Sequence, residues 1–219
     1  MTNLPEPKWV KGLALPEQKT LNDEVLSKHE ELIRVQKELA AAEVRLETYK
    51  RWYRLLYDDG QSLEEIIKEG LELLGAFVVK TSREKDDYRL KVRGFVDGVV
   101  EIKGTHNMKF SIGALRQLAG WMDEANASDH IAVKGVFIGN SARNDELSSR
   151  GKLFETNCED YANIKDIVIV RSMDIFCLVI LKQLDLLKVG VFWEELFACK
   201  GILDAGKYWK LLPGEFSAS

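Results

Sequence analysis

Glu101 and Lys103 lie two residues apart in the apolar, β-prone segment of residues 99–103. Successive side chains of a strand point to opposite faces of a sheet, so these two side chains share one face while Val100 and Ile102 point into the core. A carboxylate and an ammonium group rarely share one face of a buried strand without a reason. The pair is therefore the first candidate for a chemical site.

A second carboxylate precedes this strand. Asp87 begins the alternating segment of residues 87–92, and a hairpin turn near Gly94 would place it across from Glu101. Two facing carboxylates repel each other unless a cation lies between them, and Mg²⁺ accepts such ligands together with water and phosphate oxygens. A bound cation lowers the pKa of water, and Lys103 would stabilise the developing negative charge. The predicted chemistry is hydrolysis of phosphodiester bonds.

Helices on either side of the strand carry polar side chains that fit the same hypothesis. Glu64 lies in the first turn of a helix predicted for residues 63–74 and could bind the cation or orient one of its ligands. Gln117 lies on the next helix and could hold a water molecule or a phosphate. Asp86 is adjacent to Asp87 and competes with it for the ligand role, and Asp87 is favoured because it begins the alternating segment.

The order of these residues resembles that of the PD-(D/E)XK, or restriction-endonuclease-like, nuclease superfamily. The resemblance covers roughly residues 60–185 and is to the branch of type IV restriction endonucleases. The segments that carry it are residues 63–75, 99–104, 115–118 and 167–176. In one departure from the family pattern, no proline precedes Asp87.

The resemblance implies a site and an activity. The implied catalytic residues are Glu64, Asp87, Glu101, Lys103 and Gln117, and the implied metal ligands are Asp87, Glu101 and Ile102. The cofactor would be Mg²⁺ or Mn²⁺, and the substrate would be DNA, with RNA left open. The expected protein is thus a metal-dependent endonuclease that hydrolyses DNA in defence or repair.

Changes in the spacing of hydrophobic residues along the chain predict the strands and helices that position this site. The predicted strands are residues 76–79, 87–92, 99–103, 132–138 and 167–170, and the predicted helices are residues 63–74, 112–125 and 173–187. Residues 140–152 are polar and predict a long surface loop. The fold class is α/β, with a restriction-endonuclease-like mixed sheet flanked by helices and preceded by a long coiled-coil helix.

Apolar residues repeat every seven positions near the start of the chain. Val25, Leu32, Leu39, Leu46 and Tyr53 mark one position, and Val35, Ala42, Tyr49 and Leu56 mark the position three residues further on. This pattern predicts one long helix, which either folds back on its own domain or pairs with a second copy. The narrow stripe favours a homodimeric coiled coil. It also supports the alternative function, a catalytically inactive nuclease-fold scaffold or adaptor that binds partners through this helix.

These elements divide the chain into four parts. They are a flexible arm of residues 1–20, a coiled-coil helix of residues 21–58, a nuclease-like domain of residues 60–190, and a C-terminal helix and tail of residues 191–219. Three of the four prolines lie in the arm. Aperiodic segments of this kind stay extended unless a partner orders them.

Composition limits the class of protein. A net charge of −4 and a pI near 5.6 argue against coating of nucleic acid by bulk positive charge. A local basic rim could still hold a phosphate backbone, and its members would be Lys109, Arg116, Lys134 and Arg143. The three cysteines are typical of free thiols in a reducing compartment. No apolar stretch near Met1 suggests a signal, so we expect a cytoplasmic protein without membrane contact.

Overall fold

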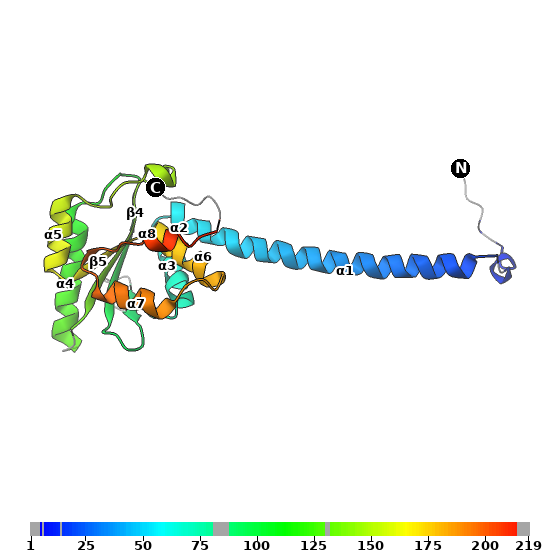
Figure 1. Ribbon diagram of the computed structural model, residues 1–219, viewed down its shortest axis with the longest axis horizontal. Helices are drawn as coiled ribbons and strands as arrows, with labels where there is room; N and C mark the ends of the chain where they lie inside the picture. Colours follow the sequence, from blue (N-terminus) through cyan, green and yellow to red (C-terminus); the bar gives the residue numbers. More distant parts are fainter. Residues whose placement is uncertain (1–4, 6, 14, 81–87, 130–131, 214–219) are drawn as a thin grey trace. The chain divides into compact units, whose positions relative to one another are not determined.

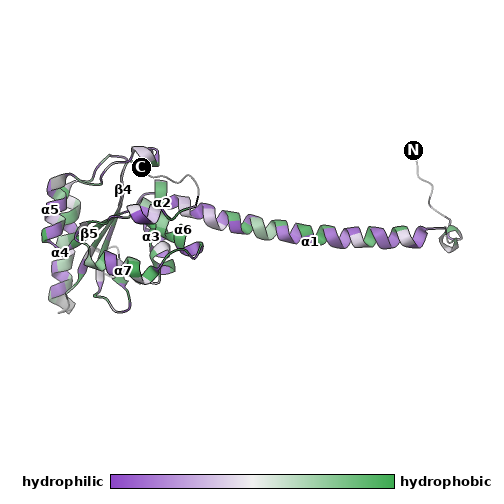
Figure 2. Ribbon diagram, viewed as in Figure 1, coloured by the Kyte–Doolittle hydropathy of each residue, from purple (hydrophilic) through white to green (hydrophobic). Residues whose placement is uncertain are grey.

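A long helix dominates the first part of the chain. The computed structural model describes residues 5, 7–13, 15–80, 88–129 and 132–213 (Figure 1), and its contacts form two compact units, Met1–Thr48 and Tyr49–Ser219. After a short 3-10 helix, η1 (Val10–Gly12), helix α1 runs over Gln18–Lys50 without a glycine or proline. No residue of α1 is buried, and apolar residues are interspersed with polar ones along it (Figure 2). The predicted long helix is confirmed.

The second unit begins with the end of the predicted heptad pattern. A 3-10 turn, η2 (Arg51–Tyr53), and helix α2 (Arg54–Tyr57) lead to helix α3 (Gly60–Leu73), which is followed by Gly75 with φ of +86°. Trp52 and Leu55 are buried in the core of this unit. The last turn of the predicted coiled-coil segment therefore belongs to the globular core, and the solvent-exposed heptads end before it.

A six-stranded mixed sheet lies at the centre of the second unit. Its strands follow the chain order and are β1 (Phe77–Lys80), β2 (Tyr88–Lys91), β3 (Gly98–Gly104), β4 (Lys134–Asn140), β5 (Ile167–Arg171) and β6 (Gly201–Ile202). The first three strands are antiparallel, and β3 to β6 are parallel. The predicted α/β class, with a mixed sheet flanked by helices and a long N-terminal helix, is confirmed.

Helices cover both faces of this sheet (Figure 1). Helices α4 (Ile112–Asp129) and α5 (Thr156–Ile164) pack on one face, here called the α4 face, over Val99, Phe137 and Ile169. The opposite face, called the α6 face, is covered by α3, α6 (Ser172–Gln183), α7 (Val189–Ala198) and α8 (Gly206–Trp209). Alternating residues of the central strands β3, β4 and β5 thus enter two separate cores.

The C-terminal part of the chain completes the core on the α6 face. Its buried residues are Phe192, Trp193, Leu196, Leu203, Ala205, Tyr208, Trp209 and Leu212. Helix α5 and strand β6 were not predicted, and the predicted loop of residues 140–152 contains a 3-10 turn, η3 (Leu147–Ser149). Within the described part of the chain, no helix combines the length and apolar character needed to cross a membrane.

Candidate functional site

Glu101, Lys103 and Gln117 meet on the α4 face of the sheet. Nζ of Lys103 lies 2.7 Å from Oε1 of Glu101 and donates a hydrogen bond of 2.9 Å to Oε1 of Gln117. The two charged residues come from β3, and Gln117 comes from the second turn of α4. The shared face that the sequence predicted for Glu101 and Lys103 is thus observed, and α4 supplies the third group.

Burial changes steeply along this strand. The side chain of Glu101 is 3% exposed and that of Lys103 is 34% exposed, because β3 leaves the core at its carboxyl end. Glu101 is level with Phe137 of β4, which is fully buried on the same face. Burying a carboxylate is costly unless it is paired, and the ammonium group of Lys103 provides the pairing. The arrangement places a shielded negative charge beneath a solvent-accessible positive one.

Two other predicted site residues are placed differently. Oε2 of Glu64, in α3, lies 3.5 Å from Nζ of Lys80 at the end of β1, so its described ion pair is with Lys80. The side chain of Ile102 is buried in the core of the α6 face, which leaves its main-chain carbonyl as the group that could bind a cation. The structure therefore gives Glu64 a contact outside the Glu101–Lys103–Gln117 cluster.

The aspartates proposed as metal ligands, Asp86 and Asp87, lie outside the described residues. Tyr88, the next residue, pairs with Val100, the residue before Glu101, and the strands are antiparallel. The predicted β2–β3 hairpin is thereby confirmed. Among the residues that the structure describes, no group of three or more His, Cys, Asp or Glu side chains is arranged to hold a metal ion.

The predicted basic rim is only partly present. Lys134 is 2% exposed and pairs with Gly98 at the opposite end of the strands, about 16 Å from the level of Lys103 at ~3.3 Å per residue. Its ammonium group donates to Oδ1 of Asp166 and to the carbonyl of Cys199, both at 2.6 Å. Lys134 is a buried structural cation, so its assignment to the rim was wrong. Lys134 is the one charged residue in the apolar segment 132–138, and the sequence alone did not show that it is buried.

Arg143 joins the segment after β3 to the start of α3. Its guanidinium lies 2.6 Å from Oδ2 of Asp59, donates to the carbonyl of Tyr57 at 3.0 Å, and lies 2.7 Å from Nε2 of His106. Gly104 packs against Asp59 so closely that a Cβ atom there would lie 2.5 Å from the Cβ of Asp59. Arg143 thus fixes the turn before α3 beside the carboxyl end of β3, the strand that carries Glu101 and Lys103.

Arg150 makes a second set of bonds at the same place, which sequence patterns did not predict. It donates to the carbonyl of Leu56 at 2.7 Å, to Oδ1 of Asn140 at 3.2 Å and to the carbonyl of Arg143 at 3.0 Å. Asn140 in turn donates to the carbonyl of Asp58 at 3.0 Å. The polar residues of the 140–152 segment therefore tie the α2–α3 turn to the end of β4.

No protein-family model and no curated protein matches this chain. Two solved structures are similar to 68% of it: the restriction endonuclease FokI, with 10% identity and a TM-score of 0.47, and FokI bound to DNA, with 12% identity and a TM-score of 0.46. The matches span 30% and 29% of the respective FokI chains. A likeness of this extent carries no residue-level information about the site.

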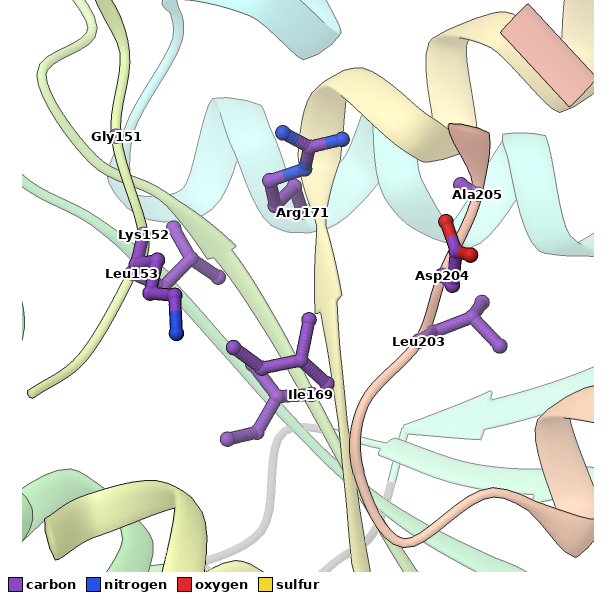
Figure 3. Close-up of a pocket in the computed structure, with 9 residues that line it drawn as sticks. Gly151, Lys152, Leu153, Ile169, Arg171, Leu203, Asp204 and Ala205 are labelled. Atoms are coloured by element: carbon purple, nitrogen blue, oxygen red, sulfur yellow. The ribbon is translucent and has the colours of Figure 1, made fainter. Parts of the chain in front are cut away.

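A separate cavity of about 410 Å³ lies on the α4 face at the ends of β5 and β6. Figure 3 shows Lys152 and Leu153 on one side, Leu203 and Asp204 on the other, and Ile169 and Arg171 between them. Arg171 is level with Gly139 and Lys103 in the sheet. The space above Gly139 is filled by Phe110 and Leu153, so the cavity is separated from Lys103.

The guanidinium group at this cavity belongs to the last residue of β5 and is held by Asp174 in the helix that follows, α6. Arg171 donates two hydrogen bonds of 2.8 Å to Asp174, and Trp209 donates a third to the same carboxylate at 2.9 Å. Burial disfavours the charge of Arg171, but the hydrogen bonds and the charge of Asp174 raise its pKa. Arg171 is therefore a cation fixed and compensated by Asp174.

Proposed function

We propose that this protein is a metal-dependent endonuclease that hydrolyses phosphodiester bonds of DNA. The observation that carries the proposal is the contact of the buried Glu101 carboxylate with Lys103, 2.7 Å apart at the exit of a central strand. A purely structural ion pair gains little from such a position, because desolvation of the two charges offsets most of their attraction. A lysine that contacts a phosphate must reach solvent, whereas the carboxylate that holds it can be buried, and this is how Lys103 and Glu101 are exposed.

The chain's own groups have distinct roles in this proposal. Lys103 would contact the scissile phosphate and stabilise the charge that develops on it. Gln117 orients the Lys103 ammonium through the 2.9 Å hydrogen bond, and its amide oxygen can accept a second hydrogen bond from a water molecule. Glu101 keeps Lys103 close to the strand end when no substrate is present.

A divalent cation such as Mg²⁺ or Mn²⁺ fits the chemistry of the donor set. Glu101 offers a carboxylate, Ile102 a main-chain carbonyl, and both are oxygen donors of the kind that hard cations prefer. We retain Asp87 as the second carboxylate because it adjoins Tyr88, which pairs with the neighbour of Glu101. When bound, the cation would supply an acidified water molecule and charge neutralisation.

A second copy of the chain is the proposed partner of α1. This helix has 33 residues and none is buried, although it carries exposed leucines at heptad positions, such as Leu32 and Leu39. A monomer gains nothing from such a stripe, whereas a two-stranded coiled coil buries it. Dimerisation would present two sites to the two strands of a duplex.

The exposed helix also favours the second candidate function, an adaptor that uses the nuclease-like unit as a scaffold. In that case, the Glu101–Lys103–Gln117 cluster would be a self-contained set of polar contacts without catalytic use. The two candidates differ in whether the cluster needs a cation and a substrate. Both keep α1 as the surface that binds a protein partner.

Plasmid cleavage tests the enzyme. The purified chain is incubated with supercoiled DNA, and separately with RNA, in Mg²⁺ or Mn²⁺. The variants Lys103→Ala and Asp87→Ala are assayed in parallel. The control is Lys165→Ala, which replaces an exposed lysine outside the proposed site. Cleavage by the parent and control alone is expected. Absence of cleavage by every form, together with absence of Mn²⁺ binding in calorimetric titration, would reject the enzyme in favour of the adaptor.

A further inference from the structure

A lysine interrupts the heptad stripe of α1. The second series of heptad positions holds Val35, Ala42 and Tyr49, but Lys28 occupies the position before them. The side chain of Lys28 is 71% exposed, and its ammonium group lies 3.0 Å from Oε2 of Glu31 on the same helix. A polar residue at a heptad position restricts how a second helix can pair, because its charge must be accommodated in the seam.

The orientation of the second helix decides what Lys28 meets. In a parallel pair in register, equivalent residues face each other, so Lys28 would lie against Lys28 of the second copy. In an antiparallel pair, the two series of heptad positions face each other, and one register that aligns the whole stripe places Leu32 opposite Ala42. Lys28 then lies opposite Leu46, and its aliphatic stem can pack on the leucine while the ammonium group stays in solvent.

Charged residues beside the stripe favour the same orientation. In a parallel pair, a flanking residue approaches the residue five places later in the second copy, so Glu38 would meet Glu43 twice. In the antiparallel register above, Glu31 meets Arg45 of the second copy, and the two-fold symmetry of the pair makes this contact twice. Among the flanking contacts along α1 in this register, the like-charge contact is that of Glu38 with its own equivalent, which occurs once.

The ion pair within α1 does not compete with this contact. Lys28 lies against Oε2 of Glu31, and a carboxylate can accept several hydrogen bonds. Oε1 of Glu31 can therefore accept from the Arg45 guanidinium of the second copy.

We propose that α1 pairs antiparallel with α1 of a second copy, in the register that places Leu32 opposite Ala42. Lys50 of one copy is then level with Glu24 of the other, which puts the two Lys50 residues about 39 Å apart along the pair at ~1.5 Å per residue. The second unit begins at Tyr49, so the two second units are attached at opposite ends of the pair. This inference rests on the proposed self-association of α1 and adds its orientation.

Exchange of two charges tests the register in the full-length chain. Glu31→Arg alone, or Arg45→Glu alone, brings like charges together twice in the antiparallel pair, so each should weaken the dimer about 4- to 30-fold in sedimentation equilibrium. The two substitutions together restore opposite charges and should recover most of the parent affinity. Glu30→Arg and Arg34→Glu are the matched controls, because they make the same charge changes on the side of α1 away from the stripe.

Distances between two spin labels measure the orientation independently. Thr48→Cys is labelled in a Cys199→Ser background, since Cys158 and Cys177 are buried. Antiparallel pairing separates the two labels by at least about 33 Å along the pair. Parallel pairing places them level with each other, within about 20 Å across the pair.

The outcomes separate this inference from the proposed function. A dimer with level labels, or one in which the two charge substitutions weaken association additively, overturns the antiparallel orientation and leaves the proposed coiled coil standing. A monomeric parent overturns both. An antiparallel dimer that does not cleave DNA supports the orientation and rejects the enzyme. Circular dichroism of each variant identifies any that has lost its helix.

Discussion

Gln117 and Lys103 are joined by a 2.9 Å hydrogen bond that connects helix α4 to the end of strand β3. The amide oxygen thus holds an ammonium group that also lies 2.7 Å from Oε1 of Glu101. Gln117→Ala should therefore leave the fold intact and lower the cleavage rate about 10- to 100-fold, the usual cost of removing a positioning contact. The measurement is plasmid nicking, with Asp123→Ala on the same helix as a control. Equal rates for the two variants would contradict the role of Gln117.

Asp174 is a buried anion with three described donors, and its removal should destabilise the second unit. Asp174→Ala leaves the Arg171 guanidinium without its bidentate partner and the indole N–H of Trp209 without an acceptor. The expected loss in the free energy of unfolding is about 3–5 kcal/mol. Urea unfolding measures it, and Asp160→Ala, an exposed site on α5, should change stability by less than about 0.5 kcal/mol.

The elements with a clear hydrophobic period were predictable from the sequence. The strands around Glu101 and the helix of Gln117 were found because apolar residues alternate or recur at helical spacing. Helix α5 was missed because its buried residues, Cys158 and Ala162, are small and few. Strand β6 is only two residues long, which is below the length at which a period can be recognised.

Long-range polar contacts were beyond prediction for a different reason. Arg143 donates to a main-chain carbonyl 86 residues earlier, and Arg150 to one 94 residues earlier. Every residue has a carbonyl group, so such acceptors leave no signature in side-chain patterns. Lys134 was placed on the wrong surface for the same reason, since its partners, Asp166 and the carbonyl of Cys199, come from distant segments.

Glu195 should make stability depend on pH in the acid range. Burial opposes its ionisation, but hydrogen bonds from Lys207 and Tyr208 lower its pKa below the ordinary value. The contribution to stability is present above the unfolded-state pKa of ~4.3 and is lost as the pH falls through the folded-state value. Glu195→Gln should cost about 1 kcal/mol at neutral pH.

Urea unfolding at neutral and acidic pH measures this dependence. The difference between parent and Glu195→Gln should shrink as the pH falls, because the parent carboxylate becomes protonated and loses its charge-assisted bonds. Glu194→Gln, the exposed neighbour, is the control and should follow the parent at both pH values. A difference that persists unchanged in acid would show that the Glu195 charge is irrelevant.

Self-association should depend on the heptad positions of α1. Leu32→Glu combined with Leu39→Glu places charges in the proposed seam and should convert a dimer into a monomer at micromolar concentration. Sedimentation equilibrium measures the change. Val44→Glu is the matched control, since Val44 is 67% exposed and lies off the heptad stripe. A monomeric parent, or a dimer that survives the double substitution, would contradict the coiled coil.

Replacing Gly104 and Gly120 by alanine should change the free energy of unfolding in opposite directions. A Cβ at Gly104 would lie 2.8 Å from the Cα of Asp59, which is backbone and cannot rotate away. Gly104→Ala must therefore push the start of α3 from the end of β3, at a cost of about 1–3 kcal/mol. It should also reduce cleavage, because Lys103 is the adjacent residue.

Gly120 lies within α4, and nothing is within 4 Å of a Cβ built there. Gly120→Ala should stabilise the unit by about 0.5–1 kcal/mol, since alanine restricts the unfolded chain and favours the helix. Thermal unfolding of both variants measures the contrast, and plasmid nicking shows whether only Gly104→Ala impairs the site. If Gly104→Ala were as stable and active as Gly120→Ala, the close contact between β3 and Asp59 could not be what positions Lys103.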